Sequence, residues 1–130
     1  MTTATVQRFP VLFTGINRWL RWIGISPARS FVEVSPTGIR VRMAWGFTLD
    51  ADRAAVRSSE PDHDPVRGWG VHGWRGRWLV NGSSSGLVRI TFDPPVAART
   101  MVFPLRVHTL RVSVEDPDGL VAALPPAPRP

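Results

Sequence analysis

The 130-residue sequence contains no cysteine, which excludes disulfide bonds, thiol nucleophiles and cysteine metal sites. It also contains no lysine: all sixteen basic residues are arginine, a compositional bias that makes the arginine count weak evidence for nucleic-acid binding. No apolar run reaches the roughly 20 residues that a membrane-spanning helix needs. No internal repeat of useful length appears. The sequence therefore predicts a protein that folds without covalent cross-links.

What the sequence does contain is enough for one domain with a genuine core. Apolar residues make up 43% of the chain and charged residues 20%. The formal net charge of +6 favours anionic partners such as phosphates, lipid headgroups or an acidic protein. We expect a cytoplasmic protein, with peripheral membrane association as a further option.

The N-terminal segment, residues 1–28, carries arginines and aromatic residues and has no acidic side chain. Asn17 and Arg18 interrupt its apolar run, which argues against a signal peptide. On a helix, an apolar stripe would lie apart from the arginines, although Gly15 and Gly24 weaken that prediction. Two interpretations remain open: a helix packed on the domain, or a segment lying in a membrane surface. The residues predicted for the membrane interface are Arg18, Trp19, Arg21 and Trp22.

From residue 29 to 124 the pattern predicts a mainly β domain of about seven strands. Apolar and polar residues alternate along 39–45, so this strand has one buried and one wet face, and 31–35 is its expected partner. Residues 77–81 and 87–92 flank a glycine- and serine-rich stretch and are predicted to form a hairpin. The proline-bounded loop 60–65 is predicted to be exposed. Further strands are expected at 47–50, 54–59, 101–103 and 109–114.

The sequence has one clear helix signal near its C-terminus. Asp116 can cap the helix, Pro117 suits its first position, and Leu120, Val121 and Leu124 form an apolar face. The remaining residues, 125–130, are rich in proline and are predicted to form an extended tail.

This element order carries a resemblance. With its paired strands Phe-Val-Glu-Val and Ile-Arg-Val-Arg, its segment Leu-Val-Arg-Ile-Thr-Phe and the ending at 112–124, the chain resembles uncharacterised actinobacterial proteins that look like bacterial pleckstrin-homology (PH)-like domains. The resemblance implies a PH-like antiparallel β-barrel or sandwich closed by a C-terminal helix. Inositol-phosphate binding in that family would imply roles for Arg29, Arg40 and Arg42. The turn Ser35–Gly38, however, is too short and too poor in positive charge to cradle a headgroup, so these arginines are better explained as the wet face of a strand.

The segment 69–78 holds half of the six tryptophans. Alternation along a strand would place Trp74 and Trp78 on the core face. The same alternation leaves a candidate surface for an anionic or aromatic partner through cation–π contacts and charge-assisted hydrogen bonds. The predicted binding residues are Trp69, His72, Arg75 and Arg77.

No catalytic constellation stands out, so we expect a protein that is not an enzyme, with no cofactor and no metal. Gly82–Gly86 matches a nucleophile-elbow pattern but precedes a strand where a helix is needed. Asp62, His63, Asp64 and His72 could be assembled into a metal site, yet they are better explained as loop residues. The leading hypothesis is a PH-like interaction module that binds a protein or an anionic membrane surface. A small-molecule-binding β-barrel is the alternative, and single-stranded nucleic-acid binding is less favoured because the arginines are spread along the chain.

Overall fold

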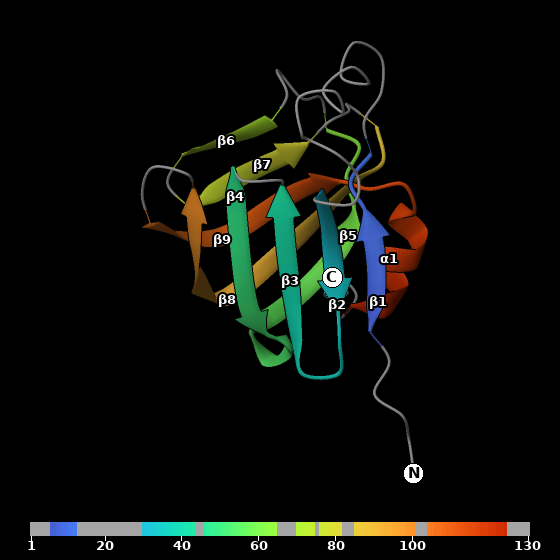
Figure 1. The fold of residues 1–130 in the computed structure, drawn as a ribbon, viewed down its shortest axis with the longest axis horizontal. Coiled ribbons are helices and arrows are strands. Elements are labelled where there is room, and N and C mark those ends of the chain that lie inside the picture. The colour runs from blue at the N-terminus through green and yellow to red at the C-terminus, as the bar shows by residue number, and fades with distance from the viewer. Residues whose placement is uncertain are drawn as a thin grey trace.

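The computed structural model describes residues 6–12, 30–43, 46–64, 70–74, 76–81, 85–100 and 104–124. These residues form a mainly β fold with an α-helix near the C-terminus, which confirms the fold class predicted from the sequence (Figure 1). The strands are β1 Gln7–Pro10, β2 Ser30–Val34, β3 Gly38–Met43, β4 Phe47–Asp52, β5 Val56–Pro61, β6 Gly70–Trp74, β7 Arg77–Asn81, β8 Leu87–Thr100 and β9 Pro104–Ser113, and the helix is α1 Pro117–Ala123.

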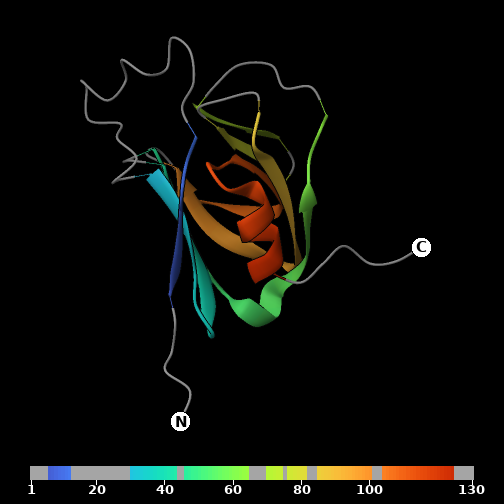
Figure 2. The ribbon, with the colours of Figure 1, turned by 90° about the vertical axis from the view of Figure 1, so that its right-hand side faces the viewer.

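The strands belong to one curled sheet with the order β1-β2-β3-β4-β8-β9-β7-β6. The 14-residue strand β8 allows the curl, because its first half pairs with β5 while its last residues pair with β4. Strands β4 and β5 therefore lie on the same side of β8, joined by a short 3-10 turn at Arg53–Ala55. The result is an open half-barrel, and α1 lies at its open side (Figure 2).

The core fills the concave face of the half-barrel. Strand β3 shows the alternation expected from the sequence: Ile39, Val41 and Met43 are buried, whereas Arg40 is exposed and Arg42 partly so. Burying a side chain of this size contributes about 1.5–3 kcal/mol to folding. The helix closes the core with two buried leucines, Leu120 and Leu124.

Hydrogen bonds with side chains fix both ends of α1. The N-terminal cap is the one that the sequence predicts, and the C-terminal partner is an arginine distant in sequence. Asp116 caps the N-terminus by accepting a hydrogen bond from the Gly119 N–H at 3.0 Å. At the C-terminus, Arg53 donates to the Ala123 carbonyl at 2.8 Å, which satisfies one of the carbonyls that a helix end leaves without a partner. No helix among the described residues is long and apolar enough to cross a membrane.

Part of the N-terminal segment belongs to the sheet. Strand β1 pairs with β2, and Arg8 reinforces the pairing by bonding Glu33 at 2.6 Å and lying 4.1 Å above the Phe31 ring. Beyond the strand, the Leu12 N–H donates to the Ser113 carbonyl and ties this edge to the end of β9. The rest of the segment, including Arg18, Trp19, Arg21 and Trp22, lies outside the described residues, as do 101–103 and 125–130.

The predicted hairpin of 77–81 with 87–92 is wrong. Strand β7 instead pairs with β6 in antiparallel orientation and with β9 in parallel orientation, so β9 lies between β7 and β8. The tight turn is at Gly76, whose φ of 83° suits glycine, and it joins β6 to β7. The prediction failed because segment 70–74 has two glycines and only one β-branched residue, and was not taken for a strand. The alternation predicted along 74–78 also assumed one continuous strand, whereas the turn at Gly76 places Trp74 in β6 and Trp78 in β7.

Strand β8 also runs further than predicted. It continues beyond Phe92 to Thr100 although Pro94 and Pro95 lack the N–H that a β ladder requires. These prolines fall where the β8–β9 register shifts between Thr91 and Val96, so no ladder hydrogen bond is demanded of them. The register shift lies between the part of β8 that pairs with β5 and the part that pairs with β4.

Candidate functional site

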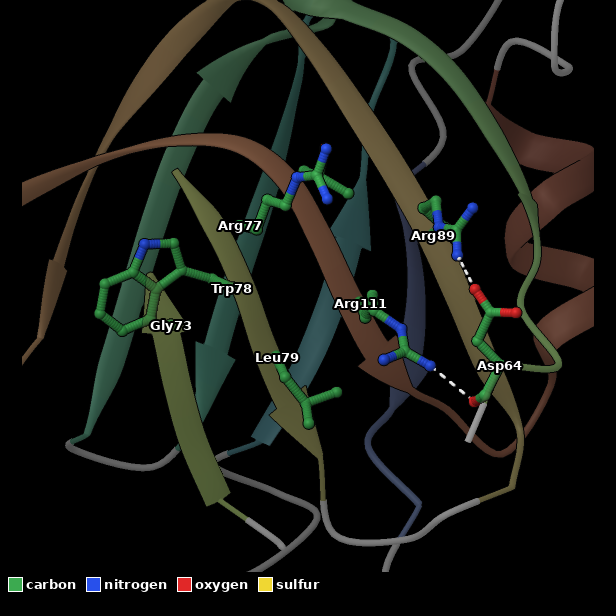
Figure 3. A pocket seen from close by; sticks show the side chains of 8 residues that line it. Asp64, Gly73, Arg77, Trp78, Leu79, Arg89 and Arg111 are labelled. Carbon is green, nitrogen blue, oxygen red and sulfur yellow. Dashed lines mark hydrogen bonds and ion pairs between the residues drawn. The ribbon is translucent and has the colours of Figure 1, made fainter. Parts of the chain in front are cut away.

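A groove of about 760 Å³ is lined mainly by residues of β7, β8 and β9 that alternate with core residues and point outward, together with Gly73 and Trp78. This volume is within the range of small-ligand sites in proteins, roughly 300–1,000 Å³. Figure 3 shows Asp64 joined by dashed lines to Arg89 and Arg111, with Trp78 extending away from them towards Gly73. The lining residues are Asp64, Gly73, Arg77, Trp78, Leu79, Arg89, Thr109 and Arg111.

One wall of the groove is held in place by a buried carboxylate. Pro61, His63 and Asp64 are exposed, as predicted for loop 60–65, but the side chain of Asp62 is only 1% exposed, so the prediction is wrong for this residue. Asp62 accepts hydrogen bonds from Nε of Arg111 at 2.5 Å, from Nη2 of Arg89 at 3.3 Å and from the Asp64 N–H at 2.9 Å. A buried carboxylate needs such partners because leaving it unpaired costs several kcal/mol.

The same two arginines also hold Asp64. Arg89 donates to the Asp64 carboxylate at 2.5 Å, and Arg111 donates to the Asp64 backbone carbonyl at 2.7 Å. The guanidinium groups of neighbouring strands β8 and β9 therefore clamp the start of the connection that leaves β5. This clamp therefore fixes Asp62 and Asp64 beside the outward-facing arginines of β8 and β9.

The clamp changes the pKa of its charged groups. Burial alone would raise the pKa of Asp62, but the hydrogen bonds from the Asp64 N–H and Arg111, with the charges of Arg111 and Arg89, hold it below its ordinary value. For Arg89, burial acts to lower the pKa, and the bond to Asp64 with the neighbouring carboxylates outweighs it and raises the pKa. Both groups are therefore charged at neutral pH.

This pKa shift predicts an acid-sensitive contribution to stability. A carboxylate whose folded-state pKa is lowered stabilises the fold fully above its unfolded-state pKa of about 3.9, and loses that contribution as the pH falls through the folded-state value. We expect the free-energy difference between the wild type and Asp62→Asn to be constant above about pH 5 and to shrink below about pH 4. Urea unfolding between pH 2 and pH 7 measures it. An equal difference at pH 3 and pH 7 would contradict the assignment.

A bulge in β9 sets the other side of the groove. The N–H groups of His108 and Thr109 both donate to the Gly76 carbonyl, at 2.7 and 3.0 Å, so two residues of β9 face one residue of the β6–β7 turn. Their side chains consequently lie on the same face, where Nδ1 of His108 is 3.0 Å from Oγ1 of Thr109. Beyond the bulge the outward positions are Thr109 and Arg111, and before it they are Arg106 and His108.

Trp78 forms the apolar end of the groove. Its ring lies across the backbone of its cross-strand partner Gly73, because a Cβ atom placed there would be only 2.0 Å from the indole. Its other contact is with the core, through Phe47 at a ring-centroid distance of 6.3 Å. Trp78 is partly buried and packs against the core cluster, as the sequence pattern predicts.

The predicted binding patch is only partly within the described chain. Arg77 lines the groove and is exposed. His72 lies in β6, but its side chain is outside what the structure describes, and so are Trp69 and Arg75. The sequence pattern did not indicate Arg89, Thr109 and Arg111 as site residues, and it suggested Asp62 and Asp64 only for a metal site that was less favoured than a plain loop. The available signal was weak: alternating acidic residues in a loop, and arginines at the outward positions of two strands.

Of the three arginines that the resemblance would assign to headgroup binding, the two that the structure describes are already paired. Arg40 and Arg42 both bond Asp50, at 3.2 and 3.1 Å, and Arg29 lies outside the described residues. A second groove of about 400 Å³ lies beside them at the β2–β3 turn, with Glu33 and Asp50 in its lining. Its basic residue, Arg40, is thus already paired, and an anionic ligand is better served by the groove at Arg77.

The described residues contain no group of three or more His, Asp or Glu side chains placed to hold a metal ion. Comparisons with models of protein families, with curated proteins and with solved structures find no match for this chain.

Proposed function

We propose that the protein is a non-enzymatic, PH-like interaction module whose groove between Asp64 and β7 binds an anionic group of its partner. The observation that supports this is the charge of Arg77. It is exposed at the groove, and no carboxylate in the described part of the chain pairs with it. A guanidinium at the edge of a defined groove can hold a carboxylate or phosphate through two parallel hydrogen bonds.

The clamp also orients the guanidinium of Arg111, which can bind the same ligand. Arg111 uses Nε and Nη2 to bond Asp62 and Asp64, which fixes the orientation of its planar group. An arginine has five N–H donors, so donors remain for a ligand in the groove that Arg111 lines. Because this side chain is ordered before the ligand binds, the entropic cost of binding is lower. Trp78 and Leu79 supply apolar contact beside the charged groups.

The interior of the half-barrel is a poorer candidate for a ligand. Phe47, Leu49, Ile90, Phe92 and Leu110 fill the concave face and are fully buried. Such close packing leaves little room for a small molecule between the sheet and α1. The outer groove is therefore favoured over the small-molecule barrel. Membrane binding by this protein would depend on Arg18, Trp19, Arg21 and Trp22, and it stays a prediction. Flotation with anionic vesicles at low salt tests it.

The groove predicts binding of small anions that depends on Arg77. We expect acetylated triglutamate, titrated at low salt and followed by NMR, to bind the wild type and to bind Arg77→Gln about threefold to fivefold more weakly. The matched control is Arg57→Gln, which removes one exposed charge outside the groove and should bind like the wild type. The proposal fails if neither triglutamate nor inorganic phosphate binds, or if the two variants behave alike.

A further inference from the structure

The unpaired arginines of the described chain are not scattered. Of its ten arginines, six pair with carboxylates: Arg8, Arg40, Arg42, Arg57, Arg89 and Arg111. Arg53 bonds backbone carbonyls of Ser35 and Ala123 instead. The remaining three, Arg77, Arg99 and Arg106, are exposed and have no carboxylate partner among the residues that the structure describes. All three come from β7, β8 and β9.

Strand register places these arginines in one row on the outer face of the sheet. Arg106 stands opposite Ala97, and Arg99 opposite Pro104, so the two arginines are diagonal neighbours on adjacent strands, roughly 7–8 Å apart. His108 follows Arg106 on the same face, about 7 Å further along β9.

The bulge then connects the row to the groove. A Cβ atom on Gly76 would lie 3.6 Å from Cβ of His108 and 3.8 Å from the Arg106 carbonyl, so the β6–β7 turn lies directly against this part of β9. Arg77, the next residue, is level with Thr109 across the parallel pair. The basic row, defined as Arg99, Arg106, His108 and Arg77, thus ends at the groove and is roughly 20 Å long.

We propose that the basic row is a docking track for an extended acidic segment of a partner protein, with one end of that segment in the groove. The inference deepens the proposed function by naming the class of partner. An extended chain rises about 3.3 Å per residue, so roughly six residues span the row. Alternate side chains of such a segment are about 7 Å apart, which matches the spacing along β9. Charge complementarity supports this occupant, because carboxylates suit the guanidinium fork.

Other anionic surfaces fit the row less well. A membrane surface is favoured by exposed apolar side chains, yet the only exposed large hydrophobic residue in the described chain is Val6, on the far side of the sheet order. Single-stranded nucleic acid is usually held by aromatic rings on which bases stack. The aromatic side chains that the structure describes are buried or partly buried, and Trp78 lies over Gly73.

Peptide length tests the track. We expect hexaglutamate to bind the wild type more tightly than triglutamate in fluorescence anisotropy at low salt. The double variant Arg99→Gln, Arg106→Gln should weaken hexaglutamate binding roughly fivefold to tenfold and leave triglutamate binding unchanged. The matched control, Arg40→Gln with Arg57→Gln, removes the same number of positive charges at arginines that pair with carboxylates, and it should bind like the wild type. Thermal unfolding confirms that both variants are folded.

The other outcomes separate the two proposals. Hexaglutamate binding that is insensitive to Arg99 and Arg106 overturns the track and leaves the groove standing. Absence of both triglutamate and phosphate binding overturns the groove itself. The choice of an acidic protein is overturned if hexathymidylate, or vesicles containing phosphatidylserine, bind more tightly than hexaglutamate with the same dependence on Arg99 and Arg106.

Discussion

Replacing Asp62 with alanine is expected to lower the free energy of unfolding by about 3 kcal/mol, a large effect for a loop residue. The substitution removes the shared acceptor of Arg89 and Arg111 and leaves the Asp64 N–H without its bond. The side chains of Arg89 and Arg111 are 33% and 21% exposed, so water compensates part of the loss and keeps it at the lower end of the range for buried ion pairs. Urea unfolding at pH 7 measures it.

Asp50→Ala is the matched control for this prediction. Asp50 also bonds two arginines, Arg40 and Arg42, but its side chain is 56% exposed. Exposed pairs contribute about 0–1 kcal/mol because water screens them. We therefore expect Asp50→Ala to cost less than about 1 kcal/mol. Equal losses in the two variants would mean that burial of Asp62 contributes nothing, and the clamp would then have no part in shaping the groove.

The sequence predicts best those elements whose signals are local. The alternation along β3 depends only on which side chains face the core, and the cap at Asp116 with Pro117 depends only on the start of a helix. Pairing between distant strands has no such local signal. Strand β7 follows β6 through the turn at Gly76 and then joins β9 in parallel, and nothing in residues 77–81 distinguishes that arrangement from a hairpin with 87–92.

The candidate site likewise combines a residue with a local sequence signal and residues that only the fold brings together. Arg77 could be predicted because it lies in a segment rich in tryptophan, arginine and glycine. The clamp could not, since Asp62 meets Arg89 and Arg111 only after β5, β8 and β9 are paired, at sequence separations of 27 and 49 residues. The spread of arginines along the sequence likewise hid the basic row. Which arginines of the described chain remain unpaired is decided by the fold, because it brings carboxylates to six of the others and backbone carbonyls to Arg53.

Replacing Trp78 with alanine is expected to destabilise the fold by about 3 kcal/mol, since removal of a large buried aromatic side chain costs about 3–5 kcal/mol and Trp78 is only partly buried. The indole ring covers the backbone of Gly73, which has no side chain to fill the space, and it also contacts Phe47. Both contacts disappear together in the variant. Thermal and urea unfolding measure the loss.

Arg77→Ala distinguishes this role of Trp78 from that of its neighbour. Arg77 precedes Trp78 on β7 and faces away from the core, so its removal should change stability by less than about 0.5 kcal/mol while weakening triglutamate binding. Trp78→Ala should instead reduce stability first and binding through the loss of the groove wall. A strand that placed Trp78 outward would show the opposite: a small change in stability for Trp78→Ala and a large one for Arg77→Ala. Measuring both properties in both variants therefore tests the orientation of β7 directly, and with it the face of the sheet on which the groove and the basic row lie.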